Sequence, residues 1–167
     1  AKDCSYSKQE FIDLQRMGLE YGVRIIPEID IPAHSLAFAH YKPEIASRKY
    51  GMDHLDLYKK ETYQFVDSLL DEYLSGDNPV FIGDLHIGTD EYNKKEAEQY
   101  RYFTDRYLKF VEKYGKNVRM WGGLKWLPGK TPVKAEGVTV NAWSYDWVDP
   151  VVSLQDGYKL INTCDTY

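Results

Sequence analysis

Two adjacent carboxylic acids, Asp90 and Glu91, are the strongest candidates for chemistry in this sequence. They follow a short apolar run, Val80-Phe81-Ile82, and precede a long helical pattern, so we expect them where a buried strand opens into a loop. Like charges held together in a poorly solvated cleft raise one pKa, so one acid can keep its proton near neutral pH. Most Asp-Glu pairs are solvated surface charges, but His86 and Gly88 just before this pair favour a functional strand end.

Further polar or aromatic residues stand where the other strands are expected to end: Asp30 and His34, Trp121, Trp143, and Tyr167. Because the carboxyl ends of successive parallel strands converge on one mouth, we expect these side chains to surround a single site. Core packing of the two tryptophans, and a purely structural role for the histidine, remain open alternatives. The Gly122-Gly123 pair predicts an exposed bend, whereas Trp126 and Trp147 are given no role.

A metal site is a competing interpretation of the same residues. Its candidate nitrogen and oxygen ligands are Asp30, His34, His54, Asp84, His86 and Asp90. None of these residues shows the H-x-x-x-H or H-x-H spacing that makes a metal motif specific. We therefore predict a site that uses neither a metal nor another cofactor.

Strands and helices alternate along the chain and predict an α/β fold. Strands are expected over residues 23–29, 80–87, 118–121, 138–143 and 158–163. Helices are expected over residues 7–22, 61–74 and 94–114, the first beginning with the capping box Ser7-Lys8-Gln9-Glu10, and a helical turn over residues 150–155. Residues 35–57 look irregular and predict a long insertion at the top of a βα unit. Right-handed crossovers would give five parallel strands covered by helices.

The length and composition favour one domain that spans residues 1–167. A whole eight-fold barrel needs about 250 residues, more than this chain has. The net charge of −5, without long runs of one sign, gives no reason to expect nucleic acid or an anionic membrane as partner. An aromatic content of 15% suits surfaces that stack on sugar rings, or equally a Tyr-rich core.

The ends of the chain and its cysteines say little about the compartment. Cys4 and Cys164 are too few and too far apart for a disulfide framework or a zinc site. No apolar stretch approaches the length of a membrane span, and the first residues, Ala1-Lys2-Asp3, have no signal-peptide character. If the protein is exported, its signal lies outside this sequence.

At two places the sequence resembles the family 20 glycoside hydrolases, which include β-N-acetylhexosaminidases and lacto-N-biosidases. The stretch from His86 to Glu91 matches that family's H-x-G-x-D-E motif, and the stretch from Ile26 to His34 is similar to its strand-three motif, with Ala33 in place of the usual glycine. The resemblance covers essentially the whole chain. It implies part of a TIM (β/α)8 barrel, roughly strands three to seven. Strands one, two and eight would be missing, together with the family's substrate-binding arginine and last pocket tryptophan.

The resemblance also implies a retaining, substrate-assisted hydrolysis of glycans that contain N-acetylglucosamine or N-acetylgalactosamine. Glu91 would be the general acid and base, and Asp90 would orient the substrate's acetamido group. Asp30 and His34 would support the catalytic acids. The substrate would be bound by His86, Trp121, Trp143 and Tyr167. We expect a secreted, cell-surface or periplasmic enzyme. Two alternatives stay open: a non-catalytic carbohydrate-binding fragment and a metal-dependent barrel hydrolase. Whether a monosaccharide or a disaccharide is released also stays open, because Gly122-Gly123 departs from the polar residues often found there in simple exo-acting members.

Overall fold

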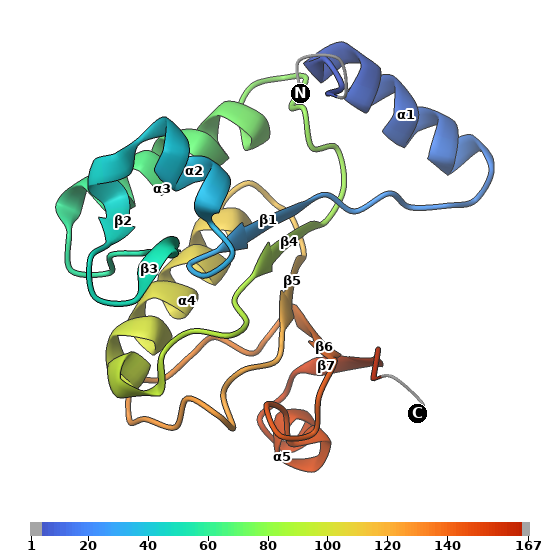
Figure 1. Ribbon diagram of the computed structural model, residues 1–167. Helices are drawn as coiled ribbons and strands as arrows, with labels where there is room; N and C mark the ends of the chain where they lie inside the picture. Colours follow the sequence, from blue (N-terminus) through green and yellow to red (C-terminus); the bar gives the residue numbers. More distant parts are fainter. Residues whose placement is uncertain (1–4, 165–167) are drawn as a thin grey trace.

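A five-stranded parallel sheet organises the computed structural model, which describes residues 5–164 (Figure 1). In spatial order its strands are β1 (Glu28–Ile31), β4 (Leu85–Gly88), β5 (Val118–Trp121), β6 (Val138–Ala142) and β7 (Lys159–Asn162). Each strand runs parallel to its neighbours. Strands consecutive in this sheet are therefore joined by crossovers on its face, which confirms the predicted α/β fold class.

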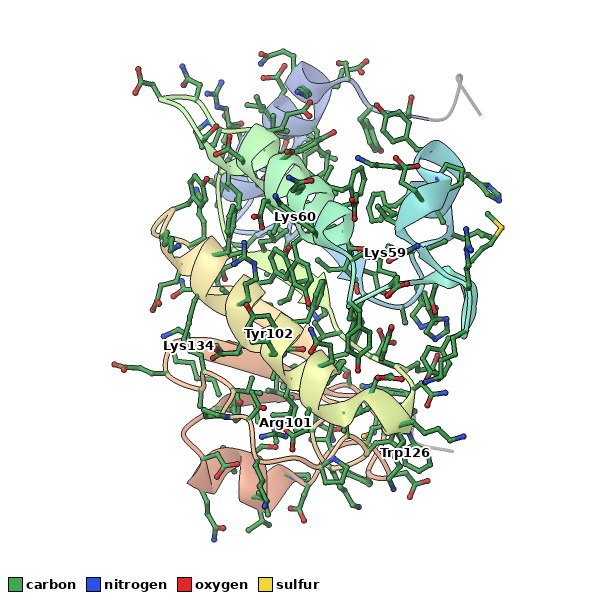
Figure 2. The ribbon with its side chains drawn as sticks, turned by 90° about the vertical axis from the view of Figure 1, so that its left-hand side faces the viewer. Lys59, Lys60, Arg101, Tyr102, Trp126 and Lys134 are labelled. Atoms are coloured by element: carbon green, nitrogen blue, oxygen red, sulfur yellow. The ribbon has the colours of Figure 1, made fainter. Side chains whose placement is uncertain are left out.

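The main crossover helices are α3 (Lys60–Leu74) and α4 (Ala97–Glu112), which lie together on one side of the sheet (Figures 1 and 2). Both lie close to their predicted bounds. A 3-10 turn, η3 (Lys94–Glu96), leads into α4, and α5 (Pro150–Gln155) is the predicted helical turn. Among the described residues, no helix combines the length and the apolar character needed to cross a membrane.

The two faces of the sheet differ in chemistry because alternate residues of a strand point to opposite sides. One set, which includes Met120 and Val140, is buried in the same core as Phe103 and Tyr107 of α4. The other face carries a polar row in which strand register aligns Glu28, His86, Arg119 and Thr139. This second face leads up to the candidate site.

The first helix, α1 (Lys8–Glu20), begins with the predicted capping box. Ser7 Oγ accepts a hydrogen bond from the Glu10 amide at 3.2 Å, and the Glu10 carboxylate accepts one from the Ser7 amide at 2.7 Å. On the buried side of α1, Gln15 donates to the Val80 carbonyl at 2.7 Å and accepts from the Ile82 amide at 3.1 Å. The segment at residues 80–82 thus bonds to a helix side chain.

Two predicted strands are shorter and later than expected. The predicted strand at residues 80–87 is wrong in its first half, because Gln15 satisfies the backbone there, and β4 begins only at Leu85. The prediction for residues 23–29 is also wrong: Val23 is 56% exposed, and β1 begins at Glu28, where β4 first supplies a partner. An extended apolar sequence becomes a strand only beside another strand.

The predicted irregular insertion at residues 35–57 is instead ordered. It contains α2 (Leu36–Tyr41), η2 (Pro43–Ile45) and an antiparallel ribbon of β2 (Ala46–Ser47) and β3 (Gly51–Leu55). Ile45 and Leu55 are fully buried in the main core. We infer that this burial, which the polar and irregular pattern concealed, anchors the ribbon beside the site.

Candidate active site

The backbone at the end of β4 is held in an unusual conformation. Gly88, Thr89 and Glu91 have φ values of 68°, 76° and 48°, in the left-handed region that side chains disfavour. The hydroxyl of the fully buried Tyr100 donates to the Thr89 carbonyl and helps to hold the turn. Gly88 has a further reason to be glycine, because an added Cβ would lie 1.8 Å from Oδ1 of Asp30. Strained backbone of this kind is concentrated at functional sites.

Across that close approach, Asp30 of β1 meets Asp90. One carboxylate oxygen from each, and a ring nitrogen of His34, lie within 4.8 Å of one another. Burial, reinforced by the charge of Asp90, raises the pKa of Asp30 to about 7. Burial also raises the pKa of Asp90, although the hydrogen bond with Asp30 opposes that rise. Both carboxyls in this pair therefore hold a proton to higher pH than an aspartic acid in solvent.

His34 joins both acids of the Asp-Glu pair. Its Nε2 lies 3.1 Å from Oε2 of Glu91 and 3.5 Å from Oδ2 of Asp90, and its own backbone has a φ of 53°. The two acids differ in accessibility, since the Glu91 side chain is 47% exposed and that of Asp90 only 16%. A bound molecule can thus exchange a proton with Glu91, while Asp90 is placed to act through fixed contacts.

A second cluster lies on the same face of the sheet. Trp121 Nε1 donates to Oε1 of Glu28 at 2.6 Å, and the His86 imidazole packs against the indole with 4.8 Å between ring centroids. Burial raises the pKa of Glu28, a shift that the Trp121 hydrogen bond opposes. Sequence reasoning did not select Glu28, yet it stands two residues before Asp30, on the same strand face, and that spacing was the available signal.

His86 is uncharged in this cluster. Burial, followed by the positive charge of Arg119, lowers its pKa to about 4. Its Nδ1 accepts a hydrogen bond from the Gly88 amide at 3.1 Å, so the 3.4 Å approach to Glu28 is not an ion pair. Only 6% of His86 is exposed, and its ring packs against Trp121. Its predicted contact with substrate remains a prediction.

Of the remaining predicted aromatic residues, the structure describes Trp143. Trp143 donates through Nε1 to the Gly122 carbonyl at 2.9 Å and lies 5.4 Å from Trp147, which itself lies 5.1 Å from Trp126. Trp126 and Trp147, to which the sequence assigned no role, thus extend the aromatic surface away from Trp143. Tyr167 lies outside the described residues.

The prediction of an exposed bend at Gly122-Gly123 is wrong. Both glycines are buried, and a Cβ at Gly122 would lie 1.9 Å from Cγ2 of Val148. The close packing of the loop after β6 against this position leaves room only for glycine. The loop after β5 is therefore packed against its neighbour where it begins, at Gly122 and Gly123, whereas Lys125 and Trp126 further along are exposed.

Three of the six proposed metal ligands come together: Asp30, His34 and Asp90. The others are directed elsewhere. Asp84 lies before the start of β4 and faces Arg24 and Arg119, and His54 contacts Asp53 at 3.0 Å. The gathered set offers one imidazole and two carboxylates.

Comparison with known proteins identifies the family to which this chain belongs. Residues 1–100 match the model of the catalytic domain of glycosyl hydrolase family 20, and the chain belongs to that family. It is 29% identical to a beta-hexosaminidase of Arthroderma benhamiae over 93% of its own length and 31% of the relative. With a lacto-N-biosidase of Bifidobacterium bifidum it shares 25% identity over 94% of its length and 16% of the relative.

Solved structures agree on the fold. The GH20 beta-N-acetylhexosaminidase of Streptomyces coelicolor A3(2) superposes with a TM-score of 0.76 and 26% identity, over 95% of this chain and 34% of that one. The beta-N-acetylhexosaminidase of Bacteroides fragilis superposes with a TM-score of 0.74 at 20% identity, over 94% and 35%. The predicted part of a TIM (β/α)8 barrel is confirmed. The chain spans less than a third of the beta-hexosaminidase of Arthroderma benhamiae and of the lacto-N-biosidase.

Proposed function

We propose that the protein carrying this sequence hydrolyses β-linked N-acetylhexosaminides with retention of configuration, using the substrate's own acetamido oxygen as nucleophile. The observation that carries the proposal is the unequal acid pair at the end of β4, with Glu91 accessible and 3.1 Å from His34, and Asp90 enclosed beside Asp30. Membership of family 20 supports it, since substrate assistance is characteristic of that family.

In the first step Glu91 gives its proton to the glycosidic oxygen as the bond to the anomeric carbon breaks. The acetamido oxygen bonds to that carbon, and the resulting ring carries a positive charge. Asp90 accepts a hydrogen bond from the acetamido N–H and stabilises this charge. Because the nucleophile is already part of the bound sugar, proximity contributes roughly 7 kcal/mol or more to lowering the barrier.

In the second step Glu91 takes a proton from the attacking water, which opens the ring and restores the starting acid. His34, which contacts both acids, positions them for these transfers. A proton on Asp30, whose pKa burial raises, removes the charge repulsion that would otherwise disfavour an ionised Asp90. Trp121 and Trp143 enclose the acetamido methyl group, His86 supports Trp121, and Tyr167 supplies a hydrogen bond to the acetamido carbonyl.

The test uses Glu91→Gln in the intact protein, with aryl β-glycosides of N-acetylglucosamine, N-acetylgalactosamine and lacto-N-biose as substrates. We expect kcat to fall by ~10²-fold or more, because a positioned general acid and base contributes at least that much. Glu61→Gln, on the exposed side of α3, is the matched control and should leave kcat unchanged. Near-wild-type turnover by Glu91→Gln on the accepted substrate would refute the assignment.

The same substrates decide how large a unit is released. The relatives include a beta-hexosaminidase and a lacto-N-biosidase, so both a monosaccharide and a disaccharide are candidates. Turnover of the lacto-N-bioside alone would indicate disaccharide release. A non-catalytic carbohydrate-binding protein would instead bind an N-acetylglucosamine thiazoline in calorimetry and turn over none of the three.

A metal-dependent hydrolase is the second candidate, favoured by the convergence of Asp30, His34 and Asp90. The two mechanisms separate by chelation. Activity that is lost with a chelator and restored by zinc supports a metal, whereas unchanged activity supports the carboxylate mechanism.

A further inference from the structure

A pocket of about 400 Å³ lies between α3 and α4, near the residues where both helices begin (Figure 2). Its walls come from the two helices and from the segment before α3. The side chains that line it include Tyr58, Lys60, Tyr63, Gln99, Tyr102 and Arg106. Neither Asp90 nor Glu91 lines this pocket, here called the helix pocket. It is therefore separate from the candidate active site at the strand ends.

Three tyrosine rings give the helix pocket its flat, apolar surfaces. Tyr58 and Tyr102 are 70% and 50% exposed, and the Tyr102 ring lies 6.3 Å from that of Tyr63 with 65° between the planes. The Tyr63 hydroxyl donates to the Leu57 carbonyl at 2.8 Å and accepts from the Gln99 side-chain amide at 3.0 Å. A ring that is fixed in this way loses little conformational freedom when a ligand binds.

The polar groups that face the helix pocket are mainly hydrogen-bond donors. Within residues 5–164, the Lys60 ammonium has no ion-pair partner and the Tyr102 hydroxyl has no hydrogen-bond partner. Arg106 gives one terminal nitrogen to Asp67 at 2.6 Å and lies 5.7 Å from the ring centroid of Tyr63. No aspartate or glutamate among the described residues lines the pocket. The positive charge of Lys60 is therefore not balanced by the walls of the pocket.

We propose that the helix pocket binds an acidic saccharide, with a pyranose ring on the tyrosines and a carboxylate or sulfate group at Lys60 and Arg106. The apolar C–H face of a pyranose packs against an exposed aromatic ring. A carboxylate or a sulfate accepts hydrogen bonds and donates none, which suits a wall of donors that lacks acids. Hydrogen bonds to such a charged group are about twice as strong as neutral ones. A neutral sugar would leave the charge of Lys60 unbalanced.

The helix pocket lies close to the candidate active site without being part of it. The buried Glu96 accepts a hydrogen bond from Tyr58 of the pocket through one oxygen and from Tyr50 through the other, each at 2.5 Å. Tyr50 lines a groove beside Glu91, and Trp126 lines the same groove. An acidic glycan held in the helix pocket would therefore stay beside this groove and leave Glu91 free.

The experiment uses three disaccharides that differ in one group. They are cellobiose, the same disaccharide with its terminal hydroxymethyl group oxidised to a carboxylate, and the sulfate ester at that group. None contains an acetamido group, so the proposal can fail independently of the proposed function. In ligand-observed NMR titrations of the intact protein, we expect at least one acidic disaccharide to bind about fivefold more tightly than cellobiose. The better of the two shows whether the pocket prefers a carboxylate or a sulfate.

Two substitutions test where the disaccharides bind. Lys60→Gln removes the charge and should lower the affinity for the acidic disaccharide to that for cellobiose. Tyr102→Ala removes a stacking surface and should weaken the binding of all three about fivefold. The controls are Lys113→Gln, at an exposed lysine that follows α4, and Tyr21→Ala, at an exposed tyrosine that follows α1. Neither control should change any of the affinities.

The substituted side chains are exposed, so the thermal unfolding midpoints of all four variants should match that of the wild type. Three results would each overturn the proposal. One is cellobiose binding as tightly as both acidic disaccharides. The second is an undiminished affinity of Lys60→Gln for the acidic ligand, and the third is the absence of binding by any of the three disaccharides.

Discussion

The close approach of β4 to Asp30 makes Gly88→Ala an informative substitution. The added Cβ would lie 1.8 Å from Asp30 Oδ1 and 2.7 Å from its Cα, whereas ordinary contact begins at 3.4 Å. The backbone at Gly88 also has a φ of 68°, which side chains rarely adopt. Two separate penalties therefore act at this one position.

Their sizes can be worked out separately. A left-handed backbone costs about 1–2 kcal/mol for a residue with a Cβ. Relieving an overlap in a packed place costs a further ~1–3 kcal/mol. Because these distances to Asp30 are far below contact, Asp30 or Gly88 must shift from its present position, and a 1 Å misplacement in an active site costs ~10²-fold in rate. We expect a loss of about 2–5 kcal/mol in stability.

Two other glycines in the chain provide matched controls. Gly115 has a φ of 70° with no atom within 4 Å of its added Cβ, so Gly115→Ala measures the backbone penalty alone. Gly83 is equally open and has no positive φ, so Gly83→Ala should be close to neutral. Urea denaturation and kcat/KM of the intact protein are measured for all three. If Gly88→Ala is no less stable than Gly115→Ala and fully active, the reasoning about Asp30 is refuted.

Two further predictions concern pH. Burial raises the pKa of Asp30 to about 7 from an ordinary 3.8, so the native state holds a proton that the unfolded chain has lost, and stability falls as pH rises from about 4 to 7. In Asp30→Asn this fall should be weaker, by urea denaturation at pH 5 and pH 8; an unchanged pH dependence would contradict it. Hydrogen bonds from Lys49, Tyr50 and Tyr58 lower the pKa of Glu96 to about 2, so its contribution is present above pH 4.5 and lost towards pH 2. Glu96→Gln should cost ~1–3 kcal/mol at pH 7 and little at pH 2.5, and an equal cost at both would count against this network.

Local signals in the sequence were enough for the elements with a strong internal pattern. The capping box at Ser7 and the apolar spacing of α3 and α4 predicted those helices, because helix periodicity and capping depend on residues within a few positions. The parallel sheet followed from the alternation of elements. The acid pair was found from its residue types and motif, and it does follow a strand, although the apolar run at residues 80–82 that predicted this strand lies outside β4.

Strand boundaries could not be predicted in the same way. Val23 and Val80 are β-branched residues, which are common in strands, yet neither lies in a strand. Neither backbone pairs with a strand of the sheet. Gln15 bonds to the Val80 carbonyl and the Ile82 amide, and the Val23 amide donates to the Gly18 carbonyl. Strand formation requires a neighbouring strand at the right register, and that neighbour is remote in sequence.

The sequence by itself determined which residue types stand at the strand ends, the order of the elements and the family motif. Only the tertiary structure decided that Gly88 lies against the carboxylate of Asp30, that Glu28 accepts a hydrogen bond from Trp121, and that Trp126 lines the same groove as Glu91. The physical reason is that motifs and periodicity are local, whereas pKa values, close approaches and grooves depend on which distant segments pack together and exclude water.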